Sequence, residues 1–171
     1  MTRKLFNNLL LFSFFGVALG FFGILYEGVV NVPKMLDSSM PRMLFWKNFY
    51  QVISPIPYYI PLVPIATATL IVLYFKSPKQ ESELKNRLKL AGILQVISLA
   101  LTFYIVKEMN LKLYFGDIEK YAAIIPTKTL IVNIISVIRV ALTAIALASV
   151  FKAYLQTQKE QTQLNGVKQS I

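Results

Sequence analysis

The chain contains no cysteine and no histidine among its 171 residues. Without cysteine it forms no disulfide and carries no thiol for redox or nucleophilic chemistry. Without histidine it offers no imidazole to a metal, a haem or a serine nucleophile. The side chains that remain for chemistry are carboxylates, arginine, lysine and tyrosine. We expect no metal and no cofactor.

Charged residues are also scarce, at 15% of the chain, whereas 56% of the residues are hydrophobic. The mean hydropathy is +0.56, and ordinary soluble domains are only about 45–50% apolar. The few charges lie in short stretches between long apolar runs. This pattern excludes a water-soluble globule and predicts an integral membrane protein, whose first partner is the lipid bilayer.

Four segments reach the length of about 20 apolar residues that a membrane-spanning helix needs. They cover residues 9–26, which flanking residues extend to about 6–32, and residues 53–75, 88–106 and 130–154. The sequence therefore predicts an all-α fold, a four-transmembrane-helix bundle in one domain over residues 1–155. Residues 156–171 are rich in Gln, Thr and Lys, and we expect a frayed helix end followed by a disordered, polar cytoplasmic tail.

Lysine and arginine predict the orientation because they are retained on the cytoplasmic side. The termini and the loop between the second and third spans carry ten of them with three acids, and the opposite loops carry seven with five acids. The net charges, +7 against +2, favour two cytoplasmic termini. We expect a multi-pass protein of a bacterial inner membrane with an uncleaved first span. The same bias accounts for most of the overall charge of +10, so no nucleic-acid partner is predicted.

An aromatic segment occupies the first outer loop, at residues 41–53. Its aromatic residues Phe45, Trp46, Phe49 and Tyr50 recur at helical steps, with polar residues between them. Because Trp and Tyr favour the depth of the lipid headgroups, we expect an interfacial amphipathic helix that anchors the loop. The alternative is a lid over a site between the spans.

Arg139 lies near the middle of the fourth span, where arginine costs roughly 2.5–3.5 kcal/mol on insertion scales. Two polar stripes at helical spacing are Asn133, Ser136, Arg139 and Thr143 in the fourth span, and Gln95, Ser98 and Thr102 in the third. Gln95 falls near the depth of Arg139, so a structural hydrogen bond between the two helices is one interpretation. The other is a buried cation that holds an anionic or quinone-like oxygen of a ligand.

Two carboxylates close the odd-numbered spans. Glu27 and Asn31 end the first span on one helical face, and Glu108 and Asn110 hold a similar place after the third. Such carboxylates are either solvated at the outer interface or, beneath the aromatic loop, desolvated proton acceptors. The chain has no Glu-x-x-His motif, which removes the usual di-iron site of a helix bundle.

Prolines and glycines indicate where helices break and where they pack closely. Four prolines between Pro55 and Pro64 remove backbone donors at the start of the second span. A broken helix in a membrane is tolerated where protein or a watery cavity covers it. With Tyr58 and Tyr59 beside these prolines, the outer half of the bundle is the predicted place for a cavity, the alternative being an ordinary kinked helix. Gly16 and Gly20 predict close packing against a neighbouring span or a second copy.

These features follow one another in a recognisable order. They are the segment 25–33 (LYEGVVNVP), Trp46 in an aromatic loop, the prolines 55–64, residues 102–104 (TFY) with Glu108, and Arg139. This order resembles the anthrone-oxygenase-like family of small four-helix membrane proteins, over about residues 8–155. Some relatives are implicated in cofactor-independent oxygenation of polycyclic aromatic substrates, so the resemblance implies a site for a lipophilic ligand. A histidine often invoked for that chemistry is absent here.

Three functions remain open. We favour a non-catalytic membrane or accessory protein, as a homo-oligomer or as part of a larger membrane complex. The alternative is a binding protein or oxygenase-like enzyme for a lipophilic aromatic or quinone-like small molecule, with Glu27 as base and Arg139 as oxyanion partner. A small transporter or oligomeric channel is the third. The candidate ligand-binding residues are Glu27, Asn31, Tyr58, Gln95, Tyr104, Glu108 and Arg139.

Overall fold

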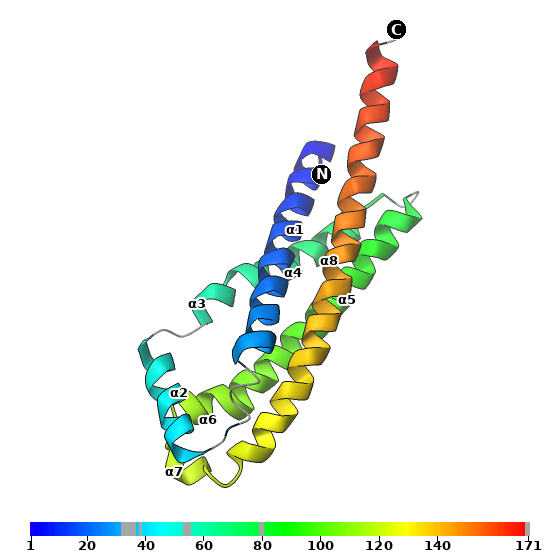
Figure 1. Cartoon of the computed structure of the whole chain (residues 1–171). Helices are drawn as coiled ribbons and strands as arrows, with labels where there is room; N and C mark the ends of the chain where they lie inside the picture. Colours follow the sequence, from blue (N-terminus) through cyan, green and yellow to red (C-terminus); the bar gives the residue numbers. More distant parts are fainter. Residues whose placement is uncertain (32–36, 38, 53–55, 79–80, 170–171) are drawn as a thin grey trace.

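The computed structural model describes residues 1–31, 37, 39–52, 56–78 and 81–169, and these residues form helices, turns and loops without a strand. Pro33 and Pro55, two of the prolines noted above, lie outside the described residues. The helices follow in the order α1 (Arg3–Tyr26), η1 (Glu27–Asn31), α2 (Met40–Val52), α3 (Ile56–Tyr59), α4 (Leu62–Lys76), α5 (Ser82–Ile105), η3 (Val106–Asn110), α6 (Leu111–Tyr114), α7 (Ile118–Tyr121) and α8 (Ile125–Gln169) (Figure 1).

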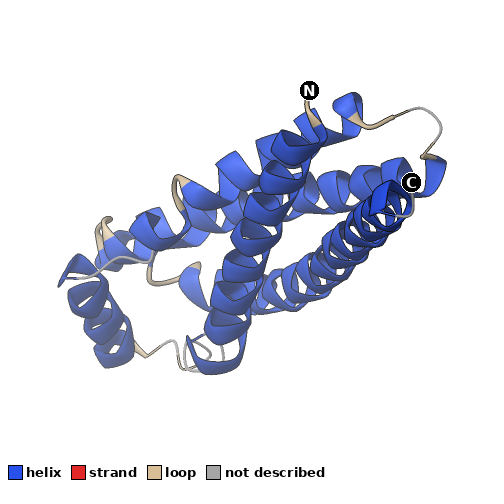
Figure 2. Ribbon diagram, turned by 90° about the horizontal axis from the view of Figure 1, so that it is seen from above, coloured by secondary structure: helices blue, strands red, loops and turns tan. Residues whose placement is uncertain are grey.

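Within the described residues, four helical stretches are long and apolar enough to cross a membrane, as the sequence predicts. They are Arg3–Val30, Pro57–Lys76, Ser82–Leu113 and Ile125–Thr162. Helices α1 and α5 each pack against both α4 and α8, so the four stretches form a bundle (Figure 2). The end that holds both termini is called the terminal end here, and the end that holds α2, α6 and α7 is called the α2 end (Figure 1).

The second span is broken near its start. Helix α3 ends at Tyr59 and α4 begins at Leu62, with Ile60 and Pro61 in a turn between them. Pro61 has no backbone N–H to continue a helical ladder, which explains why the helix stops there. Pro61 therefore marks a true break in the helix between α3 and α4, and not merely a bend.

Apolar side chains fill the bundle at the terminal end. The most fully buried of them are Leu10 of α1, Leu70 and Leu73 of α4, Leu84, Leu88 and Ala91 of α5, and Ala146, Val150 and Ala153 of α8. Gly16 brings α1 against α4, since a Cβ atom there would lie 2.4 Å from the Cβ atom of Ala66. The close packing predicted from the glycines thus has a neighbouring span as its partner.

A second apolar cluster closes the α2 end. It comprises Met43, Trp46, Tyr50, Ile105, Met109, Leu113, Ile118, Ile125 and Val132. Trp46 is only 6% exposed, and its ring stacks on that of Tyr50 with 5.6 Å between centroids. Phe45 and Phe49, on another face of α2, are about half exposed. Helix α2 therefore packs one aromatic face on the bundle and presents another outward.

Helix α8 continues to Gln169, although the sequence suggests fraying and disorder from residue 156. The first turns of α1 hold part of this extension. The Asn7 side-chain amide donates a hydrogen bond of 3.0 Å to Oε1 of Gln161, and Arg3 forms an ion pair with Glu160. These long-range contacts give the polar segment a surface to lie on, which composition alone does not reveal.

Candidate functional site

A partly enclosed cavity of about 130 Å³ lies among α1, α4, α5 and α8, beside the break between α3 and α4. Most of its wall is apolar, with contributions from Ile24, Val63 and Leu99. The polar side chains that line it are Glu27, Tyr59, Gln95, Ser98, Thr102, Asn110, Arg139 and Thr143. The cavity thus occupies the half of the bundle where the prolines of the second span predict one.

Arg139 reaches the cavity from α8 and is only 4% exposed. Its neighbours one turn away, Ser136 and Thr143, are buried as well, so this stripe faces the bundle interior as expected. The Thr143 hydroxyl donates a hydrogen bond of 2.7 Å to the Arg139 backbone carbonyl. The Nε atom of Arg139 is buried and has no hydrogen-bond partner among the described residues. Burying such a donor costs free energy unless an acceptor reaches it.

Gln95 reaches the cavity from α5 and is 2% exposed, with the buried Ser98 one turn further along. Its Nε2 atom, like Nε of Arg139, has no hydrogen-bond partner in the described part of the chain. The direct bond between Gln95 and Arg139 that their depths suggest is therefore not formed through these donors. Both side chains instead line the same cavity, and both hold a free donor.

Glu27 and Tyr59 form the acidic side of the site. Glu27 is the first residue of η1 and Tyr59 is the last residue of α3, and both are half-buried. Both side chains line the same cavity and interact electrostatically with one another. Arg139 interacts electrostatically with both of them, but the described residues include no direct ion pair between Arg139 and Glu27. The site therefore carries one positive and one negative group that share a cavity without touching.

Gly23 explains how Tyr59 comes so close to α1. A Cβ atom at Gly23 would lie 2.6 Å from Cε1 of Tyr58 and 2.9 Å from the Tyr59 hydroxyl oxygen. Any larger residue would push the short α3 helix away from α1. The missing side chain at Gly23, one turn before Glu27, thus leaves room for the Tyr59 hydroxyl against α1.

Two π-helical turns place further polar groups at this level. α1 passes into η1 at Glu27, and α5 passes into η3 at Val106. A π-helical turn is wider than an α-helical one and is frequent at functional sites. The similar Glu and Asn pairs seen in the sequence correspond to these turns, since Glu27 and Asn31 belong to η1 and Glu108 and Asn110 belong to η3. One member of each pair, Glu27 and Asn110, lines the cavity.

The cavity reaches the outer surface of the bundle on one side. Ile60, in the turn after α3, and Phe103, on α5, both line it. They are 51% and 60% exposed, respectively. This opening is on the side of the bundle, between two exposed apolar side chains. Such an opening suits a molecule that enters from an apolar phase.

The other residues expected in a site lie elsewhere. The Tyr58 hydroxyl donates a hydrogen bond of 3.0 Å to the Leu19 carbonyl, and the side chain is about half exposed. Glu108 pairs with Lys112 at 2.8 Å and with Lys128 at 2.9 Å. Tyr104 lies beside that group, with the Lys128 ammonium 6.0 Å from its ring centroid. The side chain of Asn31 falls outside the described part of the structure.

Glu27, Gln95 and Arg139 are therefore the expected residues that the structure brings together. The cavity is also lined by Tyr59, Asn110, Ile60 and Phe103. The sequence did not single out these four as ligand contacts. A signal for Tyr59 existed in its position beside the proline break, but sequence spacing does not say which of two adjacent tyrosines turns inward. No group of residues suited to a metal ion occurs in the described ranges.

Comparison with known proteins gives no relative. No family model, no curated protein and no solved structure matches the chain.

Proposed function

We propose that this protein is a four-span membrane protein that binds a neutral lipophilic molecule whose head is a single oxygen-bearing ring, of the quinone or phenol class. The observation that carries the proposal is the pair of buried, unpartnered donors, Nε of Arg139 and Nε2 of Gln95, at one mainly apolar cavity. A ligand oxygen in that cavity would supply the missing acceptor.

The size of the cavity favours one ring. An empty apolar cavity of about 150 Å³ in a protein interior accommodates benzene, and the cavity here is about 130 Å³. The polycyclic substrates implied by the family resemblance are larger than this volume. A tail on the ring would leave through the opening between Ile60 and Phe103.

The charge of the site favours a neutral head. Arg139 and Glu27 balance one another across the cavity, so a free anion would gain the attraction of one and the repulsion of the other. A ring with carbonyl or hydroxyl oxygens suits both sides. An acceptor oxygen would face Arg139 and Gln95, and a hydroxyl would face the Glu27 and Tyr59 pair.

The membrane placement of the site belongs to the same proposal. Both termini and the α4–α5 connection would lie in the cytoplasm, and α2 would lie along the outer interface with Phe45 and Phe49 among the lipids. The absence of cysteine makes this testable with single-cysteine reporters. In intact cells an impermeant thiol reagent should label Ser39→Cys and spare Ser82→Cys. The reverse pattern would invert the orientation.

Binding is tested with two small probes of similar size, 2-methyl-1,4-benzoquinone and p-xylene. Both fit a one-ring cavity, but only the quinone carries acceptor oxygens. The purified protein in detergent should bind the quinone more tightly, and Gln95→Leu should weaken quinone binding by roughly tenfold with little effect on p-xylene, because one hydrogen bond contributes about 0.5–1.5 kcal/mol. Val137→Ala, on the exposed face of α8, is the matched control.

Three results would contradict the proposal. Equal affinity for the two probes would leave the donors without a role in binding. A similar loss in Val137→Ala and Gln95→Leu would place the probe on the bundle surface. Binding of neither probe, with unchanged melting at saturating quinone, would return the protein to the class of non-catalytic accessory proteins. Adducts with lysine are recognised by mass spectrometry, and thiol adducts do not arise because the chain has no cysteine.

A further inference from the structure

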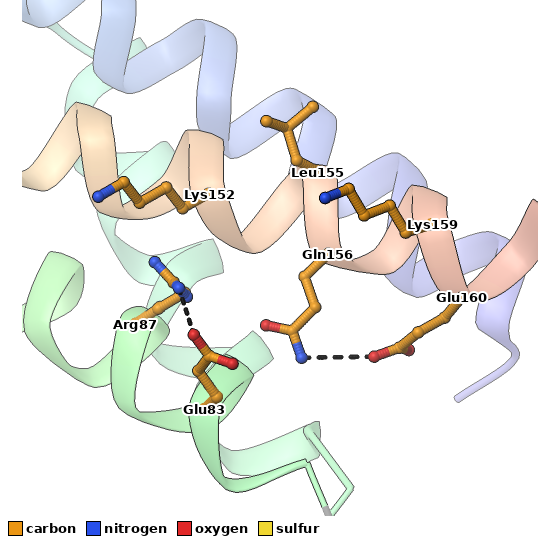
Figure 3. A pocket seen from close by; sticks show the side chains of 7 residues that line it. All are labelled: Glu83, Arg87, Lys152, Leu155, Gln156, Lys159 and Glu160. Atoms are coloured by element: carbon orange, nitrogen blue, oxygen red, sulfur yellow. Dashed lines mark hydrogen bonds and ion pairs between the residues drawn. The ribbon is translucent and has the colours of Figure 1, made fainter.

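A second, larger pocket lies at the terminal end, between the start of α5 and residues 152–160 of α8. Its volume is about 480 Å³, and it is separate from the cavity described above because it shares no residue with it. Charged side chains surround it, with Glu83 and Arg87 on α5 and Lys152, Lys159 and Glu160 on α8 (Figure 3).

The two acids of this pocket already have basic or polar partners. Glu83 forms an ion pair with Arg87, one turn along the same helix. Glu160 forms an ion pair with Arg3 of α1 and also accepts a hydrogen bond of 3.3 Å from the Gln156 side-chain amide. The negative charge of the pocket is therefore neutralised locally.

Two of its cations have no acidic partner in the described part of the chain. Lys152 and Lys159 are both exposed, and neither forms an ion pair there. They are two helical turns apart on α8, and Figure 3 shows both side chains extending in the same direction along that helix. Arg87 adds a donor, since its Nε atom is buried without a hydrogen-bond partner. The pocket thus holds an excess of positive charge with donors to spare.

An apolar residue sits among these cations. Leu155 lines the pocket between the two lysines and is 41% exposed. One turn before it, Phe151 is 44% exposed, so the outward face of α8 is still apolar up to this level. Cations beside an exposed apolar surface, at the end of the candidate spans, match an anion that carries a hydrocarbon part.

We infer that this pocket binds a phosphate group, with Lys152 and Lys159 as its main cationic contacts and Arg87 as a third donor. The phosphate is either that of an anionic phospholipid in the adjoining leaflet or a soluble phosphate anion. The two sources share the same chemistry, which is charge-assisted hydrogen bonding to phosphate oxygens. Leu155 contacts the acyl region only in the first case.

The experiment uses the full chain and separates the two sources. In the first arm, the purified protein receives equal amounts of phosphatidylglycerol and phosphatidylcholine, and native mass spectrometry measures which lipid it retains. In the second arm, melting is measured in millimolar inorganic phosphate and in chloride of the same ionic strength. Four proteins are compared, namely the parent and three double variants. The first double variant carries Lys152→Gln and Lys159→Gln, the second carries Lys152→Arg and Lys159→Arg, and the third carries Lys76→Gln and Lys89→Gln.

The last pair is the matched control, because Lys76 and Lys89 are exposed lysines at the same end of the bundle but outside the pocket. We expect the parent to retain phosphatidylglycerol over phosphatidylcholine. The Lys152 and Lys159 glutamine variant should lose roughly 25-fold in affinity at low ionic strength, a factor of about 5 for each lysine. The arginine variant should keep the preference, since it keeps the charge. All four sites are exposed, so unchanged melting without ligand verifies folding.

A rise in melting with inorganic phosphate, without any lipid preference, would assign the pocket to a soluble phosphate and remove the lipid. An equal loss in the control variant would reduce the effect to general surface charge and overturn the inference. So would the absence of both a lipid preference and a phosphate effect in the parent.

Discussion

The two halves of the bundle are built differently. At the terminal end, residues such as Leu10, Leu70 and Leu88 are fully buried and pack as one apolar core. Toward the α2 end, the space between the same four helices holds a cavity with polar side chains, among them Arg139 and Gln95. The terminal half contains the packed apolar core that stabilises a helix bundle. The other half contains a cavity and buried polar side chains, which stability alone does not require.

This difference shows which residues a function would require. Close packing of the helices in the terminal half already stabilises the folded bundle. Keeping a guanidinium, a carboxylate and an open volume in the other half costs stability. The comparison predicts that substitutions in the two halves will have effects of different size and, in one case, of opposite sign.

The largest effect is expected for Leu88→Ala in the terminal core. Leu88 is fully buried, and truncating such a leucine removes about 2–5 kcal/mol from the free energy of unfolding. Leu90→Ala is the control, because Leu90 is 45% exposed on the same helix. Reversible unfolding in mixed micelles measures both. Equal effects would mean that the terminal half is not a packed core.

A smaller loss is expected for Gly16→Ala, which adds one methyl group where α1 meets α4. The added Cβ atom would lie 2.4 Å from Ala66 Cβ, so the helices must separate, at a cost of about 1–3 kcal/mol. Gly92→Ala adds the same group with its nearest neighbour, Ile71 Cγ1, at 3.9 Å, and should be nearly neutral. Thermal melting of the two variants side by side checks this, and an equally tolerant Gly16 would show that α1 and α4 are loosely packed.

Arg139→Leu should change stability in the opposite direction. It replaces a buried charge that has an unpartnered donor with apolar volume, and it breaks no ion pair because none joins Arg139 to another described residue. We therefore expect the unfolding free energy to rise by about 1–2 kcal/mol. Arg139→Ala should gain less, because it also enlarges the cavity. Both variants should lose quinone binding. A large loss of stability in Arg139→Leu would instead assign Arg139 a structural bond inside the bundle.

The smallest effect on stability is expected for Ser98→Val, which adds volume to the wall of the cavity. Free space takes up the added methyl groups, so unfolding should change by less than about 0.5 kcal/mol, in contrast to Gly16→Ala. Binding of 2-methyl-1,4-benzoquinone should nevertheless weaken, because the ring no longer fits. Retention of full binding together with unchanged stability would show that Ser98 does not limit the space that the ring uses.

Much of the framework can be predicted from the sequence, because membrane spans have a length and a composition. The four helical stretches and the inward orientation of the Arg139 stripe follow from hydropathy and from the cost of burying charge in lipid. Which apolar residues face one another does not follow. Phe15 is 57% exposed while Val17 is buried, yet both look alike to a hydropathy scale because lipid and core are equally apolar.

The site shows the same limit. Gln95 and Arg139 are visible in the sequence because polar residues inside spans are rare. Tyr59 joins them through a helix break and through the space at Gly23, both of which depend on how α3 rests on α1. Helix α8 beyond residue 156 depends in the same way on contacts with Asn7 and Arg3, which lie over 150 positions away in the chain.

Trp46 also gives the molecule an intrinsic optical signal. It is the one tryptophan of the chain, it is 6% exposed, and its indole stacks on Tyr50 at the contact between α2 and the bundle. Its fluorescence should therefore be blue-shifted while α2 is docked and should move to longer wavelength if α2 lifts away. A change in emission on adding a ligand would report movement of this helix in real time, in the unlabelled protein.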